Sequence, residues 1–208
     1  MGCTSCHGDI KGFPHPDQVA KVNCGSCHSE AAAALGASVH SKASAQPCIS
    51  CHGDAHAVVS VNNPQSPVFA TNLPRTCGVC HGDKKFAQQH HLPDVYSEYM
   101  DSIHGFALTK DGLLVAATCS SCHGAHDILP PSNPKSRIYR ANVPATCGTC
   151  HQGLEQQYLA GAHGKALQAG DPKAPVCIRC HTAHEIFERA RRVVPDEDFG
   201  HLRQLPQG

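Results

Sequence analysis

A short pattern, Cys-x-x-Cys-His, occurs seven times in this chain and includes all 14 of its cysteines. Fourteen cysteines in 208 residues first suggest the disulfide scaffold of an exported protein. The spacing argues against disulfides, because every cysteine belongs to one of the seven copies and none is left over. Whatever fold the chain adopts must therefore present the same short turn seven times.

The chemistry that matches this pattern is covalent haem attachment. The two thiols form thioethers with the haem vinyl groups, and the adjacent histidine binds the iron from the same turn. Zinc ribbons and thioredoxin-like redox pairs also use Cys-x-x-Cys, but neither needs a histidine after the second cysteine seven times. We therefore predict seven covalently bound haem c groups, numbered here in chain order. The attachment residues are Cys3, Cys6, Cys24, Cys27, Cys48, Cys51, Cys77, Cys80, Cys119, Cys122, Cys147, Cys150, Cys177 and Cys180. The motif histidines that bind iron are His7, His28, His52, His81, His123, His151 and His181.

The composition leaves little material for a core of side chains. The chain has no Trp, aromatic residues make up 5%, and Gly and Pro number 18 and 15. Soluble domains ordinarily hold more large apolar side chains than this. We therefore expect a haem-cored array, mostly irregular with short α-helices and little or no β structure. By the same reasoning, the chain without haem is expected to be unfolded.

The motifs fall into an internal repeat. The sequence CGSCH recurs as CGVCH and CGTCH, and each copy is followed by a second motif of another type, so one unit carries two haems. The first motif of the chain resembles the second half of a unit. The predicted boundaries are 1–20 for this half-unit with haem 1, 21–72 for unit 1 with haems 2 and 3, 73–142 for unit 2 with haems 4 and 5, 143–187 for unit 3 with haems 6 and 7, and 188–208 for a C-terminal tail. We expect one continuous haem-packed body.

The stretch between the two motifs of each unit reads as a helix that ends in histidine: AAAALGASVHS, VYSEYMDSIHG and LEQQYLAGAHG. Asp94 is the expected N-cap of the middle helix, and Gly105 and Gly164 are the expected C-terminal stops. Unit 2 has an insertion here that contains His90 and His91. The Pro-rich connections at residues 62–67 and 130–136 are expected to be extended.

Each six-coordinate iron needs a second axial ligand, and histidine is the residue that can supply it. Methionine is excluded as a general solution because the chain has only two. Each full unit offers one histidine at the end of the predicted helix and one shortly after its second motif, and the half-unit offers one more. These seven candidates for seven irons are His15, His40, His56, His104, His126, His163 and His184. His90, His91 and His201 are left over.

Two stretches, CGTCHQGLEQQYLAGAHGKAL and CIRCHTAHEI, resemble the multihaem cytochromes of respiratory and metal-reducing bacteria and archaea. The resemblance extends from Cys3 to about Ile186. It implies bis-His haems in alternating stacked and T-shaped pairs, in the periplasm or outside the cell. Relatives include soluble carriers, quinol-linked membrane partners and subunits of extracellular cytochrome filaments. Two departures stand out: no Cys-x-x-Cys-Lys motif is present, and His15 lies eight residues beyond its motif histidine where the other units have three or four.

These features predict electron transfer rather than catalysis. Ligation by two histidines gives a low potential and leaves no open position on the iron for a substrate. We expect an electron conduit of anaerobic respiration that works as a carrier or as a filament subunit. The alternative is a multihaem reductase with one open-coordination haem, and a structural or sensory haem protein ranks last.

The remaining expectations concern partners and location. Lys and Arg number 17 and Asp and Glu number 17, mixed along the chain, so a nucleic-acid partner is not expected. The predicted partners are other redox proteins or an extracellular electron acceptor, and head-to-tail copies of the chain. No run of about 18 apolar residues occurs. We therefore expect no membrane span and no signal peptide in these residues, an exported periplasmic or extracellular protein, and a Met1 that need not be the start.

Overall fold

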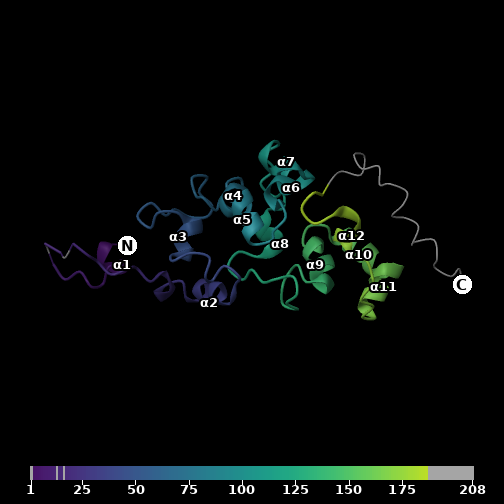
Figure 1. The fold of residues 1–208 in the computed structure, drawn as a ribbon, viewed down its shortest axis with the longest axis horizontal. Helices are drawn as coiled ribbons and strands as arrows, with labels where there is room; N and C mark the ends of the chain where they lie inside the picture. The colour runs from purple at the N-terminus through teal and green to yellow at the C-terminus, as the bar shows by residue number, and fades with distance from the viewer. Residues whose placement is uncertain (1, 13, 16, 187–208) are drawn as a thin grey trace, which may run out of the picture.

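The computed structural model describes residues 2–12, 14–15 and 17–186. The predicted tail and His201 lie outside these residues. The described chain is elongated: α1 (Cys3–Cys6) lies near one end of the long axis, and α10 (Gln152–Ala160) to α12 (Cys177–His181) lie near the other (Figure 1). The remaining helices follow one another between these ends, so chain order and position along the molecule largely agree.

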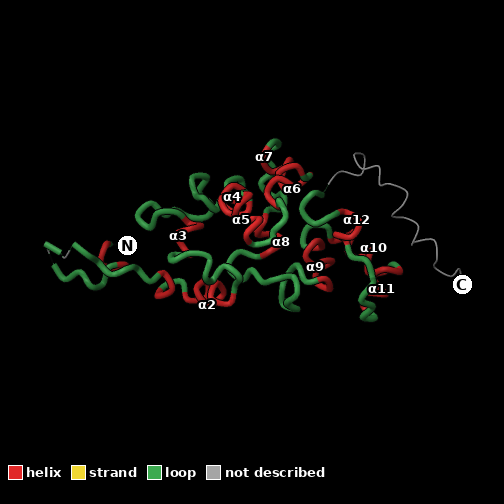
Figure 2. The backbone as a smooth tube through the Cα atoms, in the orientation of Figure 1, coloured by secondary structure: helices red, strands yellow, loops and turns green. Residues whose placement is uncertain are grey.

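Short helices joined by turns make up the described residues, and no strand occurs among them (Figure 2). The predicted fold class is thereby confirmed. The other helices are η1 (Cys24–Ser26), α2 (Ser29–Ala37), α3 (Pro47–His52), α4 (Leu73–His81), α5 (Lys84–Gln89), α6 (Val95–Asp101), α7 (Ile103–Thr109), α8 (Cys119–His123), η2 (Arg140–Asn142), α9 (Val143–Gly148) and α11 (Ala162–Gln168). Among the described residues, no helix is long and apolar enough to cross a membrane.

Most of the shortest helices coincide with the cysteine motifs. One helical turn suits Cys-x-x-Cys-His because side chains at positions i, i+3 and i+4 share a face. Both thiols and the imidazole therefore project to the same side. In α4 and α9 the helix starts earlier, with a buried proline in its first turn, Pro74 or Pro144, where the missing N–H costs nothing.

The Pro-rich connections are not extended, contrary to the sequence-based expectation. Each is a series of turns in which every third N–H bonds to the carbonyl three residues earlier. The side chain of Asn142 fixes the second series by donating to the carbonyls of Pro134 and Ser136, at 2.8 Å each. Asn72 does the same for the first series, at the end of unit 1, toward Pro64 and Ser66. These asparagines hold each Pro-rich connection, which we call the leader of the next unit, against the motif helix that follows it.

The predicted connecting helix is broken in two in units 2 and 3. Asp94 caps α6 as expected, since its side chain accepts from the N–H of Ser97. The prediction that Gly105 and Gly164 stop their helices is wrong, because both lie in the first turn of the following helix, α7 or α11. A Cβ on Gly105 would lie 2.1 Å from the carbonyl oxygen of Tyr99. Glycine is needed there for close helix crossing and not for termination.

The described polypeptide has a very small side-chain core. Besides Pro74 and Pro144, its buried apolar residues are Leu108, Val143, Ala174 and Val176. Many other apolar side chains stay exposed, Val115 at 79% and Val79 at 73% among them. Protein side chains therefore supply little of the apolar burial that usually offsets the conformational entropy of folding.

Candidate haem-binding sites

Five motif histidines each face one of the predicted second ligands. The ring centres of all five pairs are separated by nearly the same distance. The pairs are His7–His56, His40–His81, His52–His126 and His104–His151 at 6.0 Å, and His123–His184 at 5.9 Å. The spacing is uniform although the angle between ring planes varies from 3° to 69°.

That separation fits one iron between two imidazoles. A metal–imidazole bond is about 2 Å long, and the ligating nitrogen lies about 1.1 Å from the ring centre. Two rings on opposite sides of one iron therefore have centres about 6.2 Å apart. Imidazoles packed directly face to face would lie closer, so the gap matches an intervening metal better than ring stacking. The described histidines thus form pairs suited to a haem iron, and no cluster of three or more metal ligands occurs among the described residues.

Each pair joins two different repeat units. Second-motif histidines His7, His52 and His123 face the histidine that follows the second motif of the next unit. First-motif histidines His81 and His151 instead face the connecting histidine of the preceding unit. The predicted units are therefore interleaved through their ligands, which the sequence repeat did not reveal.

A residue with positive φ after the second motif of each full unit directs the chain toward its neighbour. Gly53 and Gly124 have φ of +83° and +86°, and Thr182 has φ of +63°. Glycine adopts this region without steric cost, whereas a β-branched residue rarely does. The Thr182 hydroxyl donates to the carbonyl of Glu185 and so helps to hold the same turn.

A backbone hydrogen bond then fixes the loops of units 2 and 3 on the unit before. The N–H of Val39 donates to the carbonyl of Ile128 at 2.9 Å, and that of Ile103 donates to Ile186 at 2.7 Å. Both donors directly precede a connecting histidine, and both acceptors lie two residues beyond a loop histidine. Because the two bonds join equivalent residues, the loops of units 2 and 3 lie at equivalent positions on the units before them.

The thiols of successive motifs lie side by side. Within units 2 and 3 the first cysteine thiols of the two motifs interact, Cys77 with Cys119 and Cys147 with Cys177. The interaction with Cys147 lowers the pKa of Cys177 to about 7. The interaction with Cys119 is the main cause that raises the pKa of Cys77, and burial adds to it.

Between units, the second motif meets the first motif of the next unit. The Cys51 thiol interacts with Cys77 and Cys80, and the Cys122 thiol interacts with Cys150. The Cys24 and Cys48 thiols interact in unit 1, as their counterparts do in the other units. The motifs at haems 2 to 7 thus form an uninterrupted series, and the His7–His56 pair ties the first motif to it.

Burial favours the neutral imidazoles that iron binds. His123 is the clearest case, since burial, followed by the nearby His184, His81 and His40, lowers its pKa to about 4. Burial is also the largest cause that lowers the pKa of His52 and His104. Burial therefore favours the neutral form of these rings.

The other predicted ligands lie toward the two ends of the molecule. His15 is exposed in the segment between α1 and η1, and His28 is exposed just after η1. His163 lies in the first turn of α11, and His181 is exposed at the end of α12. Within residues 2–12, 14–15 and 17–186, no ring contact joins His163 to His181.

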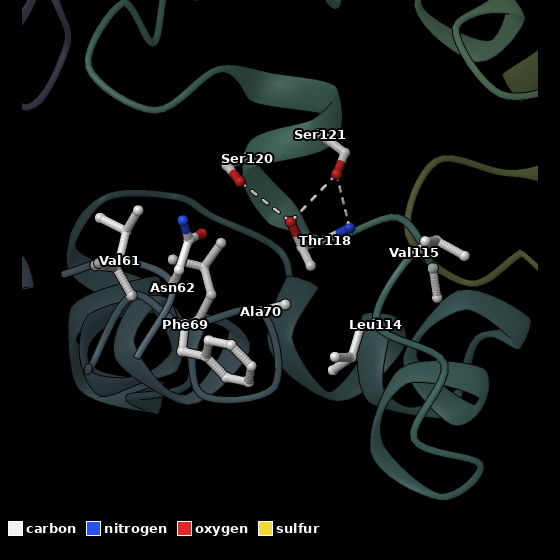
Figure 3. A pocket seen from close by; sticks show the side chains of 12 residues that line it. Val61, Asn62, Phe69, Ala70, Leu114, Val115, Thr118, Ser120 and Ser121 are labelled. Carbon is white, nitrogen blue, oxygen red and sulfur yellow. Dashed lines mark hydrogen bonds between the residues drawn. The ribbon is translucent and has the colours of Figure 1, made fainter. Parts of the chain in front are cut away.

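Sequence reasoning did not single out the apolar residues around the motifs. A cavity of about 450 Å³ at the start of α8 is lined by Val61, Phe69, Leu114 and Val115, among others (Figure 3). Its rim carries Thr118, whose hydroxyl contacts Ser120 and Ser121. Apolar walls beside a motif helix suit a hydrophobic macrocycle. The sequence feature that could have indicated these residues is a set of valines and leucines that do not belong to any amphipathic pattern.

The insertion of unit 2 adds an aromatic contact to one pair. Its helix, α5, places the Phe86 ring 4.3 Å from that of His90 and 6.2 Å from that of His81, between ring centres. His90 therefore packs on Phe86, and no imidazole of the described residues faces it across a 6 Å gap. His91 has a φ of +54° in the turn that ends this insertion.

The comparison with protein families matches residues 113–156 to the doubled CXXCH motif family. The matched segment contains the motifs of haems 5 and 6 and the leader between them. No curated protein and no solved structure matches the chain. The match supports a c-type cytochrome with CXXCH haem-binding motifs. Covalently bound haem c follows from the motifs themselves.

Proposed function

We propose that this cytochrome is a heptahaem electron conduit whose irons are all ligated by two histidines. The observation that carries the proposal is the set of five histidine pairs with ring centres 5.9–6.0 Å apart. We assign His56 to haem 1, His126 to haem 3, His40 to haem 4, His184 to haem 5 and His104 to haem 6. By elimination, His15 is assigned to haem 2 and His163 to haem 7.

The order of the motifs supports conduction along the chain. Neighbouring thiols lie close together from haem 2 to haem 7, so the macrocycles attached to them would be adjacent. Two neutral imidazoles per iron favour low potentials and leave no site for substrate. The protein's part is to hold the haems, exclude water with apolar side chains and keep the imidazoles unprotonated. The haems themselves carry the electrons.

Carbon monoxide binding to the reduced holoprotein tests this proposal. Carbon monoxide needs an open iron position, so seven haems with two histidines each would bind none. Optical and EPR spectra of the oxidised protein would then report low-spin iron only. Carbon monoxide binding by several haems per chain would contradict the proposed ligation.

The second candidate function is a reductase with one open haem, and haem 7 is where this structure favours it. His181 is exposed, and its ring contacts no other imidazole of the described residues. Binding of one carbon monoxide per chain, abolished when the haem 7 motif is removed by Cys177→Ser and Cys180→Ser, would support this candidate. Turnover of nitrogen or sulfur oxyanions by the reduced protein would then be the activity to measure.

We further propose that copies of the chain associate end to end as a filament, or exchange electrons with other redox proteins through the same ends. The motif of haem 1 and that of haem 7 lie near opposite ends of the long axis, which supports end-to-end transfer (Figure 1). Mass measurement over rising protein concentration tests assembly, and a constant monomer mass would reject it. A periplasmic or extracellular location belongs to the same proposal, and localisation of the native protein tests it.

A further inference from the structure

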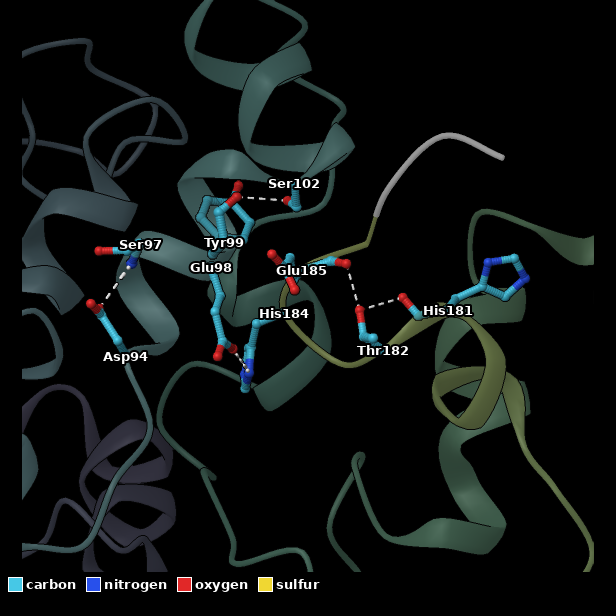
Figure 4. A network of polar contacts seen from close by, with 9 residues as sticks. All are labelled: Asp94, Ser97, Glu98, Tyr99, Ser102, His181, Thr182, His184 and Glu185. Carbon is cyan, nitrogen blue, oxygen red and sulfur yellow. Dashed lines mark hydrogen bonds and ion pairs between the residues drawn. The ribbon is translucent and has the colours of Figure 1, made fainter. Parts of the chain in front are cut away.

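Glu98 of α6 lies against His184, which comes from the loop after α12 (Figure 4). A carboxylate oxygen of Glu98 is 3.5 Å from Nδ1 of His184. The His184 ring also faces that of His123, and the two ring planes are parallel within 3°. With Nδ1 toward the carboxylate, Nε2 of His184 is left as the nitrogen that can bind iron.

We propose that Glu98 is a positioning residue that acts through His184 to lower the reduction potential of haem 5. The inference rests on the proposed function, because it takes His184 as an axial ligand. A carboxylate on the outer nitrogen of a ligating histidine fixes the ring and raises its basicity. Ferric iron carries one more positive charge than ferrous iron, so both the more basic ligand and the nearby negative charge favour the ferric form. The electron is therefore bound less tightly at this haem.

Burial separates this pair from the other histidine–carboxylate contact among the described residues. His56 Nδ1 lies 3.6 Å from Asp54, nearly the same distance, but the two side chains are 83% and 71% exposed. His184 and Glu98 are only 29% and 39% exposed. Water and ions screen an exposed contact, and a partly buried one keeps more of its strength. The effect on haem 5 should exceed that on haem 1.

The repeat shows that the carboxylate is particular to unit 2. Tyr99 and Tyr158 donate equivalent hydrogen bonds to the carbonyls of Ala117 and Pro175, which aligns Glu98 with Gln157 of unit 3. Counting back six residues from each connecting histidine gives Ala34 in unit 1. The loop that carries the equivalent histidine of unit 2 is fixed on unit 1 by the equivalent backbone bond. No other feature of the repeat requires an acid at this position.

Spectroelectrochemical titration of holoprotein variants tests the inference. Glu98→Gln keeps an oxygen acceptor for His184 and removes the charge, so one of the seven haems should shift to a higher potential. Asp101→Asn, on the same helix, removes an equal charge without contacting His184 and should shift no single haem. Asp54→Asn should give a smaller shift than Glu98→Gln. Ala34→Glu should lower the potential of one haem.

The EPR spectrum separates a change of potential from a change of structure. Glu98→Gln should keep every low-spin signal of the wild type, because the imidazoles stay in place. An unchanged titration curve for Glu98→Gln, or an equal shift in Asp101→Asn, would overturn the inference.

A further variant, His184→Ala, distinguishes failure of the inference from failure of the proposed function. It should add one carbon monoxide-binding haem and remove the effect of Glu98→Gln. If His184→Ala adds no such haem, His184 is no ligand and the proposed ligation fails as well. If it adds one and Glu98→Gln still shifts nothing, only the role of Glu98 is refuted.

Discussion

The pairing of His52 with His126 predicts how two alanine substitutions combine. Removing either imidazole should open one iron, so each single variant should bind one carbon monoxide more than the wild type. The rings lie 6.0 Å apart and are assigned to the same iron, so the double variant should also gain only one. If each histidine served the haem nearest in sequence, the double variant would gain two. The two ligation schemes thus differ by one carbon monoxide-binding haem out of seven in the double variant.

The assay is a carbon monoxide titration of the reduced protein, with intact mass used to verify that seven haems remain attached. Substitution of both His56 and His126, which are assigned to different irons, is the matched double variant and should gain two. His91→Ala should gain none. A gain of two in the His52 and His126 double variant would refute the interleaved ligation.

Three further predictions follow from local geometry. Asn142→Ala should destabilise the holoprotein by about 2 kcal/mol, because two carbonyls lose their donor; chemical denaturation measures this. Gly164→Ala should cost about 1–3 kcal/mol, because its Cβ would lie 2.2 Å from a carbonyl oxygen of α10, whereas Gly153→Ala meets nothing within 4 Å and should not destabilise. His40 and His81 have ring planes 69° apart, so haem 4 should give the most anisotropic low-spin EPR signal, and His40→Ala should remove it. A spectrum that keeps this signal in His40→Ala would contradict the assignment.

Local sequence was sufficient to predict the attachment chemistry. The two cysteines and the histidine of each motif lie within one turn, so their spacing alone places them on one face. The same is true of Asp94, whose capping bond spans only three residues. Composition predicted that the side-chain core of the described residues is small, since a chain without Trp and with few aromatic residues has little to bury.

Local sequence misjudged features that depend on contacts between helices. Gly105 and Gly164 look like helix stops because glycine is common after helices. Their actual role is close packing against a carbonyl oxygen of the preceding helix, which depends on how two helices cross. The leaders of units 2 and 3 contain prolines that favour extended backbone locally, yet asparagine side chains fold them into successive turns.

The sequence by itself determined that the Cys-x-x-Cys-His pattern occurs seven times and that histidines recur in register with it. Only the tertiary structure decided which histidine faces which. His184 follows its own motif by three residues, yet it faces His123 of the preceding unit, because the left-handed turn at Thr182 and the Ile103–Ile186 backbone bond carry it there. Ligand pairing depends on these contacts between units, and a repeat records only what each unit contains.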